Sequence, residues 1–411
     1  MILLTVWITL PDGEQAAVGE LACSEPDAAG AFNSEFEYAA SWLRHRQRFP
    51  LDPLSLPLGS RRFPSKNLEP PLAVFDDALP DDWGRALLAR EHHLPRGRQG
   101  APFLLREIAS HQRASIGALR FGTSRDRVHP PIPNETGSLI DLAALAAAAD
   151  AFEAGLAADP HGLQLLFAAG SSLGGARPKV LVNDGERGWI AKFSSTKRDG
   201  RFDIVGLEAV GLDLATDAGL TVPAHELRTL GNTHRRALLV ERFDTVRPDG
   251  RRHMISLRTL CRERPGVYAQ TYSELADAVR QVSAAPQDDV DRLFRQMVFN
   301  AAFGNTDDHL KNFWMVHDRA GYRLSEAFDL IPDVGERREH VLAFDYEYGA
   351  PSRSDVLALA NRWQVKHADA IIDDVLRSVS EFAGAASARS VPSANISEIE
   401  RDIARRVARL R

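Results

Sequence analysis

The strongest constraint on the fold of this chain is the point at which its hydrophobic pattern changes. Residues 179–193 hold two short apolar runs, KVLV and GWIAKF, on either side of the turn-rich NDGERG, a pattern typical of a β-hairpin. Residues 203–223 follow a helical spacing that ends at glycine and proline, and 237–240 form a continuous apolar run typical of a strand covered on both faces. From about residue 254 the pattern is mainly helical. The sequence therefore predicts an α+β fold with a β-rich lobe followed by a helical lobe.

The N-terminal part adds a smaller β-containing segment. TVWITL and AAVGEL flank the turn PDGE, as the strands of a hairpin would. Consecutive prolines at 128–137 mark a change in composition and favour an extended connector. We expect three parts: an N-terminal subdomain at 1–128, a β-rich domain at 129–243 and a helical domain at 244–411.

Composition narrows the functional classes. Over 411 residues, the apolar fraction of 44% and the charged fraction of 26% are ordinary for a soluble globular protein. The net charge of −6 argues against sequence-independent nucleic-acid binding by the whole surface. Two cysteines exclude a disulfide framework and a cysteine-based zinc site, and no window reaches the roughly 20 apolar residues of a membrane span. The simplest location is the cytoplasm.

The stretch FGNTDDHLKNFWMV, residues 303–316, collects polar groups between apolar residues, where such groups need partners. Asp307 and Asn312 have four residues between them, the Asp-x-x-x-x-Asn spacing of phosphoryl-transfer catalytic loops. In such loops the Asp orients and deprotonates the attacking hydroxyl, and the Asn oxygen helps to hold a metal ion. The alternative is a helix-terminating turn in which Asn305 and Asp307 cap backbone groups, and the spacing alone favours this alternative.

A hairpin predicted after this loop strengthens the metal-site interpretation. FWMV and YRLSEAFD flank the turn HDRAG, so Asn312 would enter the first strand and Asp329 would leave the second. The ends of a hairpin lie side by side, which would place two oxygen ligands at one edge, as suits Mg²⁺. The alternative for Asp329 is a loop cap.

Lys192 and Glu208 form the third predicted feature. Lys192 lies between Ala191 and Phe193 in the strand-like GWIAKF, and a buried ammonium there needs an anionic partner. Glu208 on the following helix is the candidate, because a strand Lys paired with a helix Glu positions ATP phosphates in kinases. The alternative is a lysine on the exposed face of an edge strand.

The glycine-rich GSSLGGARPK, residues 170–179, immediately precedes that hairpin. Glycines let backbone N–H groups approach phosphates closely, although a flexible surface turn is the alternative. The segment is not a Walker loop, because Ala176 stands where Lys is required, and it has no Gly-x-Gly. Glycine-rich loop, strand Lys, helix Glu, apolar strand, catalytic Asp and metal Asp nevertheless occur in the order of a kinase.

These residues resemble a known family, the HipA-type toxin serine/threonine kinases of toxin–antitoxin systems. The resemblance rests on SSLGGARPK, WIAKF, ALLVERFD, GNTDDHLKNF and AFDL in that order, and on VWITLPDGEQAAVGEL, LSLPL and FDDALPDDWGRALL in the N-terminal part. It covers nearly the whole chain. It implies a bilobal protein-kinase-like fold with a small β-containing N-terminal subdomain and a helical C-terminal lobe, with ATP and Mg²⁺ as cofactors.

The resemblance also implies roles for individual positions. Asp307 resembles the catalytic Asp, and Asn312 and Asp329 resemble the Mg²⁺ ligands. The positions that resemble ATP-binding residues are Lys192 with Glu208, Glu241 and Phe243 at the hinge, and Gly174 and Gly175 in the glycine-rich loop. Ser172 resembles the serine that these kinases autophosphorylate, with Ser171 as the alternative acceptor. That event would silence the enzyme, because a charge of about −1.5 to −2 beside the ATP phosphates repels them.

The substrates of this family are proteins, notably aminoacyl-tRNA synthetases, and a small DNA-binding antitoxin commonly restrains the kinase. The resemblance thus implies a growth-inhibiting toxin with a HipB-like antitoxin as a separate chain, contact with DNA only through that antitoxin, and no membrane partner. Two alternatives remain open. One is a small-molecule phosphotransferase, which uses the same Asp-x-x-x-x-Asn and metal Asp. The other is a catalytically silent module that binds nucleotide or antitoxin.

Overall fold

The structure of the chain is a computed structural model. It describes residues 1–411 except 70–71, 94–100, 112–115, 124–136, 157–159, 171–174, 232–234, 247–248, 262–269, 336–338 and 346. The predicted connector at 128–137 thus lies almost entirely outside the described residues.

The chain forms two compact units, which we describe separately. Unit 1 comprises Met1–Arg198, Glu241–Ile255 and Val316–Arg319, and unit 2 comprises Asp199–Val240, Ser256–Met315 and Ala320–Arg411. Both units contain helices and strands, so the predicted α+β class is confirmed. The division into parts at 1–128, 129–243 and 244–411 stays a prediction.

Unit 1 contains a five-stranded antiparallel sheet with the strand order β4-β3-β2-β1-β5. Its strands are β1 (Ile2–Thr9), β2 (Gln15–Cys23), β3 (Asn33–Tyr38), β4 (Arg62–Lys66) and β5 (Leu119–Gly122). β1 and β2 form the predicted N-terminal hairpin, with a bulge between Val6 and Trp7. The two apolar residues Val6 and Ile8 are buried, because alternate side chains of a strand point to the same face.

A second hairpin in unit 1 carries Lys192. β7 (Lys179–Asn183) and β8 (Gly188–Phe193) pair antiparallel with Lys179 opposite Lys192, which confirms the hairpin predicted at 179–193. The indole Nε1 of Trp83 donates to the Lys179 carbonyl at 2.9 Å and so fixes helix α3 against β7. The other elements of unit 1 are α1 (Ala40–Leu43), α2 (Ala73–Asp76), α3 (Asp82–Glu91), α4 (Ala101–His111), β6 (Gly137–Ser138), η1 (Leu139–Asp141), α5 (Leu142–Ala154), α6 (Pro160–Gly170), β11 (Thr245–Val246), β12 (Gly250–Arg251) and most of β13 (His253–Ser256).

Unit 2 begins with one long helix followed by a strand pair. Helix α7 (Ile204–Asp217) starts at Asp203, whose side chain accepts the Gly206 N–H, and it ends just before Gly219, which has a φ of +79°. The C-terminal end follows the glycine that predicted it, because glycine adopts a positive φ without strain, and Asp203 satisfies a free N–H at the other end. β9 (His225–Thr229) and β10 (Arg236–Glu241) then pair antiparallel.

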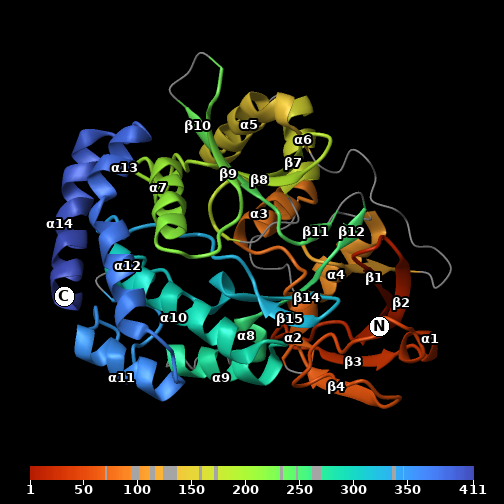
Figure 1. Cartoon of the computed structure of the whole chain (residues 1–411). Coiled ribbons are helices and arrows are strands. Elements are labelled where there is room, and N and C mark those ends of the chain that lie inside the picture. The colour runs from red at the N-terminus through yellow and green to blue at the C-terminus, as the bar shows by residue number, and fades with distance from the viewer. Residues whose placement is uncertain are drawn as a thin grey trace. The chain divides into compact units, whose positions relative to one another are not determined.

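The rest of unit 2 is helical apart from strand residues of β14 (Trp314–Asp318) and β15 (Gly321–Leu324). Its helices are α8 (Leu257–Leu260), α9 (Tyr272–Val282), α10 (Pro286–Phe303), α11 (Arg353–Trp363), α12 (Ala368–Ser380), α13 (Phe382–Ala388) and α14 (Ser393–Leu410). Helix α10 packs against α9, α12 and α14 (Figure 1). Because α10 is covered by three helices, its C-terminal end is held in place, and the predicted catalytic loop begins there.

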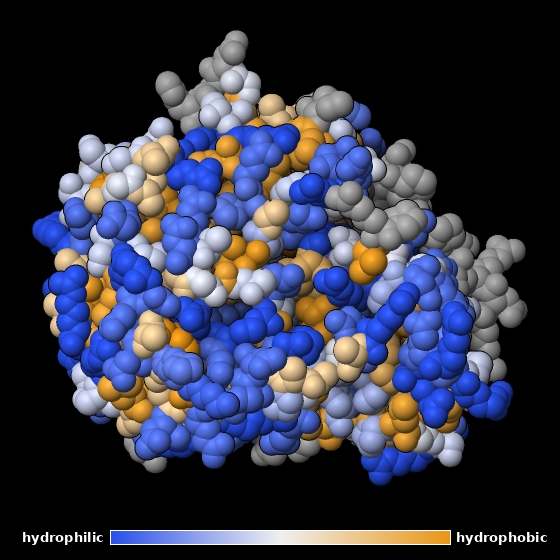
Figure 2. All heavy atoms as spheres, viewed as in Figure 1, coloured by the Kyte–Doolittle hydropathy of each residue, from blue (hydrophilic) through white to orange (hydrophobic). Residues whose placement is uncertain are grey.

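The surface of the described residues exposes few large apolar side chains. Those that are exposed are Met1, Leu3, Leu58 and Leu156. Figure 2 shows mostly hydrophilic residues on the face in view, with smaller hydrophobic areas between them. Among the described residues, none of the helices combines the length and the apolar character that a membrane span requires.

Candidate active site

The loop from Gly304 to Asn312 places two neighbouring carboxylates in opposite environments. Gly304, with a φ of +77°, ends α10, and a short 3-10 helix, η2 (Leu310–Asn312), ends the loop. Asp307 is exposed, whereas the side chain of Asp308 is 0% exposed. The exposed carboxylate is the one that the Asp-x-x-x-x-Asn spacing predicts as the catalytic base.

Asp308 anchors the loop from its buried side. Its carboxylate accepts hydrogen bonds from the Tyr272 hydroxyl at 2.6 Å, His340 Nδ1 at 2.9 Å, and the backbone N–H groups of Val341 at 2.8 Å and Leu342 at 3.3 Å. Burial, and then the Asp308 charge, raise the pKa of the Tyr272 hydroxyl well above its usual value, so this group stays a donor. Four donors on one buried carboxylate fix the backbone immediately beside Asp307.

Asn312 contacts the candidate base directly. Its side-chain Nδ2 donates to the backbone carbonyl of Asp307 at 2.9 Å, and the residue is 6% exposed. The amide oxygen, Oδ1, accepts no hydrogen bond from a described residue. A carbonyl-type oxygen with no protein donor is a ligand that Mg²⁺ accepts. Asn312 therefore fits the role of a metal ligand.

Asp329 follows in a strained backbone conformation. It has a φ of +58°, which is uncommon for a residue other than glycine, and it is half-buried. Its carbonyl accepts a long hydrogen bond of 3.5 Å from Asn305 Nδ2, which also donates to Asn300 Oδ1 at 3.1 Å. The buried Oδ1 of Asn305 has no hydrogen-bond partner in the described residues. The Asp329 backbone and the Asn305 amide thus meet at this end of α10, and the unpartnered Asn305 Oδ1 is the kind of oxygen that a hard cation accepts.

The strand ends differ from the prediction. Asn312 lies in η2 rather than entering a strand, and β15 ends at Leu324, five positions before Asp329. The hairpin itself is supported by the Ser325 N–H, which donates to the Trp314 carbonyl at 2.9 Å. The Arg292 guanidinium donates hydrogen bonds to the carbonyls of Leu324 at 2.7 Å and Ser325 at 3.0 Å. The Arg292 side chain thus contacts the backbone at the position where the strand ends.

The candidate ATP-binding residues of unit 1 have partners of their own. Lys192 is half-buried in β8. The Glu241 carboxylate forms an ion pair with Arg187 at 3.4 Å, and the Phe243 carbonyl accepts from Arg252 Nη1 at 3.1 Å. If Glu241 and Phe243 form the hinge, their backbone groups would contact the adenine, because the Glu241 side chain is paired with Arg187.

The glycine-rich loop is described only in part. Gly175 has a φ of +82°, its N–H donates to Asp81 Oδ2 at 3.3 Å, and its carbonyl accepts from the Trp83 N–H at 3.0 Å. A side chain at this position would be strained by the positive φ, whereas its contact with the flexible Lys179 side chain could be relieved by a small movement of the lysine. The predicted positions Ser171, Ser172 and Gly174 lie outside the described residues.

Glu208, the predicted partner of Lys192, lies in α7 of unit 2 and is 2% exposed. A buried carboxylate requires compensation by a partner, which is consistent with a functional role. The Lys192–Glu208 pair stays a prediction, because the two residues belong to different units.

Sequence reasoning missed the residues that hold the loop. Neither the catalytic nor the capping interpretation included Asp308, whose carboxylate accepts two backbone N–H groups and contacts Tyr272 and His340. The doubled carboxylate in NTDDH was the one available signal. It indicates that one of two adjacent acids can turn inward, but it does not say which one.

Comparison with known proteins defines the class of this chain. The HipA-like C-terminal domain matches residues 171–383, and the HipA N-terminal domain matches residues 13–122. The chain therefore belongs to the HipA family, as the sequence motifs predicted.

Individual relatives can then be named. The chain is 28% identical over 327 residues to the putative kinase Y4mE of Sinorhizobium fredii (strain NBRC 101917 / NGR234), covering 73% of this chain and 72% of that protein. It is 27% identical over 186 residues to the putative kinase Y4dM of the same strain, covering 42% of this chain and 44% of that protein. In fold it is similar to a chain of the Shewanella oneidensis MR-1 toxin–antitoxin complex of HipA, HipB and operator DNA. That match has a TM-score of 0.65 and 18% identity, and it covers 99% of this chain and 97% of the other.

Proposed function

We propose that this protein is an ATP- and Mg²⁺-dependent serine/threonine protein kinase that acts as the growth-inhibiting toxin of a toxin–antitoxin pair. The observation that carries the proposal is the exposed Asp307 carboxylate, with the Asn312 amide bonded to its backbone at 2.9 Å, inside the HipA-like C-terminal domain. Phosphoryl-transfer loops carry a base Asp and a metal-binding Asn at this spacing. The relatives named as putative kinases support the same reaction class.

Each candidate residue has a distinct role in this proposal. Asp307 would orient the substrate hydroxyl and accept its proton, and Asn312 and Asp329 would hold Mg²⁺. When bound, the metal ion would neutralise charge on the ATP phosphates. Lys192 would bind those phosphates, with Glu208 orienting the lysine. The remaining ATP contacts would come from backbone groups of Gly174, Gly175, Glu241 and Phe243.

Regulation and partners follow from the family. Autophosphorylation at Ser172, or at Ser171, would silence the enzyme through repulsion between the new phosphate and ATP. A HipB-like antitoxin would be a separate chain that brings the kinase to DNA, in keeping with the HipA, HipB and operator DNA complex of similar fold. The substrate would be a translation component such as an aminoacyl-tRNA synthetase.

Intact-mass and peptide mass spectrometry after incubation with Mg²⁺-ATP test the proposal. The wild-type chain should gain a phosphate that maps to Ser172 or Ser171, and Asp307→Asn should gain none. Asp277→Asn is the matched control, because Asp277 lies on α9 with its side chain 69% exposed. It should be phosphorylated like the wild type. ATP binding without any phosphate gain would instead favour a small-molecule phosphotransferase or a silent nucleotide-binding module.

Growth on induction separates these outcomes further. If the protein is a kinase toxin, induction of the wild type should stop growth and induction of Asp307→Asn should not. A toxin that acts by binding alone would remain toxic in both forms. Equal toxicity of the two proteins would therefore contradict the proposed mechanism.

A further inference from the structure

Unit 2 contains a cavity of about 280 Å³ that none of the candidate active-site residues lines. Its walls come from four segments: Gly219–Thr221 after α7, residues 291–296 of α10, residues 324–327 after β15, and residues 366–371 at the start of α12. We propose that this cavity binds a small ligand that carries a phosphate or carboxylate group. The volume is at the low end for ligand pockets, which suits one small molecule.

The charge of the lining favours an anion. Three cationic side chains, Arg292, Arg295 and Lys366, line the cavity together with a single carboxylate, Asp291. That carboxylate already accepts a hydrogen bond from Gln287 Nε2 at 2.7 Å, which satisfies part of its capacity. The excess of positive charge at a concave site raises the local concentration of anions.

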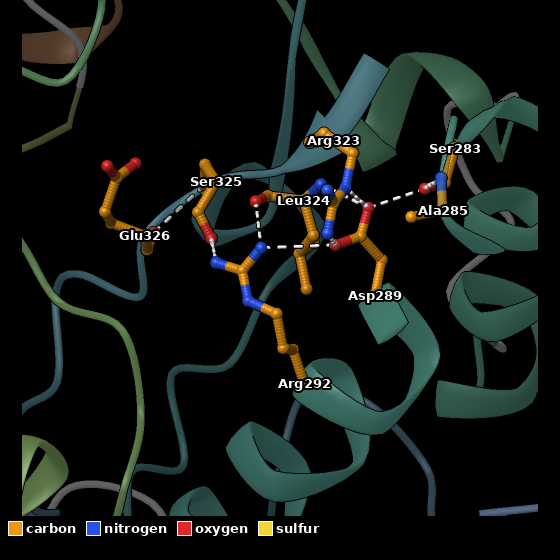
Figure 3. A network of polar contacts seen from close by, with 8 residues as sticks. All are labelled: Ser283, Ala285, Asp289, Arg292, Arg323, Leu324, Ser325 and Glu326. Carbon is orange, nitrogen blue, oxygen red and sulfur yellow. Dashed lines mark hydrogen bonds and ion pairs between the residues drawn. The ribbon is translucent and has the colours of Figure 1, made fainter. Parts of the chain in front are cut away.

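Arg292 forms a fixed wall of the cavity. Its Nη1 lies 3.2 Å from Asp289 Oδ1, and its two terminal nitrogens donate to the Leu324 and Ser325 carbonyls (Figure 3). Asp289 is itself held by Arg323 Nε at 3.0 Å and Nη2 at 3.1 Å. Because Arg292 already donates to these acceptors, it would contribute charge and a rigid wall to the site rather than a direct hydrogen bond to the ligand.

Arg295 offers the donor edge that an oxyanion needs. Its Nη1 donates to the Ala218 carbonyl at 2.7 Å and lies 3.6 Å from Asp374 Oδ2. No described residue accepts a hydrogen bond from its Nε or Nη2, and these two groups form one edge of the guanidinium. Such an edge binds two oxygens of a carboxylate or phosphate at once. Lys366 is exposed at the cavity and makes no ion pair with a described residue.

Gln296 is the second, independent indication of a ligand. It lines the cavity and is 5% exposed, yet its amide has no hydrogen-bond partner among the described residues. Its amide atoms are not among the buried side-chain atoms that lack a partner, so they keep some accessible surface and a ligand in the cavity can reach them. A ligand that places an oxygen or N–H group beside Gln296 and its anionic group beside Arg295 would satisfy both side chains.

Calorimetric titration of the full chain tests the site with two probes, inorganic phosphate and acetate. Because the probes could also bind at the candidate active site, binding is assigned to the cavity only where the two cavity variants weaken it. Lys366→Gln removes a charge, and Gln296→Leu removes the amide at similar volume. Each variant should weaken binding about tenfold or more, the effect of losing a hydrogen bond to a charged group. Arg319→Gln, an exposed position outside the cavity, should bind like the wild type.

The outcomes separate the ligand classes and can overturn the proposal. Binding of phosphate alone assigns a phosphorylated ligand, and binding of acetate as well assigns a carboxylate. Crystals soaked in selenate should show an anomalous peak beside Arg295, which locates the site without any variant. The proposal is wrong if neither probe binds, or if Arg319→Gln weakens binding as much as Lys366→Gln. The kinase assay uses Asp307, so either proposal can fail without the other.

Discussion

His340 Nδ1 lies 2.9 Å from the buried carboxylate of Asp308, and this contact connects the C-terminal helix to the candidate catalytic loop. On its other side, His340 Nε2 lies 3.1 Å from Arg406 Nη1 of α14. Arginine can only donate, so Nε2 must be the acceptor and the ring proton must be on Nδ1, which donates to Asp308. The α14 helix thereby stabilises the residue next to Asp307.

Substitution of Asp308 should reduce stability, whereas substitution of Asp307 should abolish activity, although the two residues are adjacent and chemically identical. Asp308→Ala should lower the free energy of unfolding by about 3–5 kcal/mol, because it leaves four buried donors without their acceptor. Asp307→Ala should change stability by no more than about 0.5 kcal/mol, as for other exposed positions, while abolishing phosphorylation. Urea denaturation and the mass assay measure the two effects. A large loss of stability in Asp307→Ala would contradict the assignment of the buried acid.

The contact between His340 and Arg406 should be measurable as a coupling energy. In a double-mutant cycle with His340→Leu and Arg406→Met, we expect a coupling of about 1 kcal/mol, the size of one buried hydrogen bond. Arg405→Met is the matched control on the same helix, because Arg405 is 78% exposed. It should show no coupling to His340. Additive effects of His340→Leu and Arg406→Met would mean that the contact contributes nothing to folding.

Gly304, the residue that ends α10, should not tolerate a side chain. Its φ is +77°, and an added Cβ would lie 2.9 Å from Arg406 Nε and 3.3 Å from Asp402 Oδ2. Gly304→Ala should lower the free energy of unfolding by about 1–2 kcal/mol from the positive φ alone, and by more from the displaced Arg406. Gly200→Ala is the control, with a φ of +56° and nothing within 4 Å of the added Cβ. If both variants lose the same stability, the contact with Arg406 has no role.

Unit 1 should lose stability as the pH falls below neutrality. His253 and His317 both contact the Phe49 ring, with ring centroids 5.7 Å and 3.6 Å away. Burial lowers the pKa of His253 to about 4 and, together with the nearby His253, lowers the pKa of His317 to about 3. Between these values and the unfolded pKa of about 6.5 the unfolded chain binds more protons, so stability decreases as pH decreases. From pH 7 to pH 5, His253 alone should cost roughly 2 kcal/mol.

Urea midpoints at pH 7 and pH 5 measure this loss. His253→Gln keeps a side-chain donor for the Leu51 carbonyl, which His253 Nε2 contacts at 2.9 Å, but it does not titrate in this range. The variant should therefore show a smaller difference between the two pH values than the wild type. An unchanged difference would mean that His253 is not the group that takes up the proton.

Local elements of the fold could be predicted because their signals lie within short stretches of sequence. The β7–β8 hairpin follows from two apolar runs around a turn, and α7 follows from its apolar spacing with Gly219 after its C-terminal end. The end of β15 could not be predicted, because its last carbonyl and the next one contact Arg292, a side chain on helix α10 that is distant in the sequence.

For the candidate site, the sequence by itself determined which residue types occur and in what order, and through them the HipA family. Only the tertiary structure decided which of Asp307 and Asp308 is buried. The partners of Asp308 lie 36, 32 and 33 positions away in the chain, at Tyr272, His340 and Val341. A carboxylate becomes buried only where folding brings enough hydrogen-bond donors to it, and a local sequence pattern does not show which distant donors will reach it.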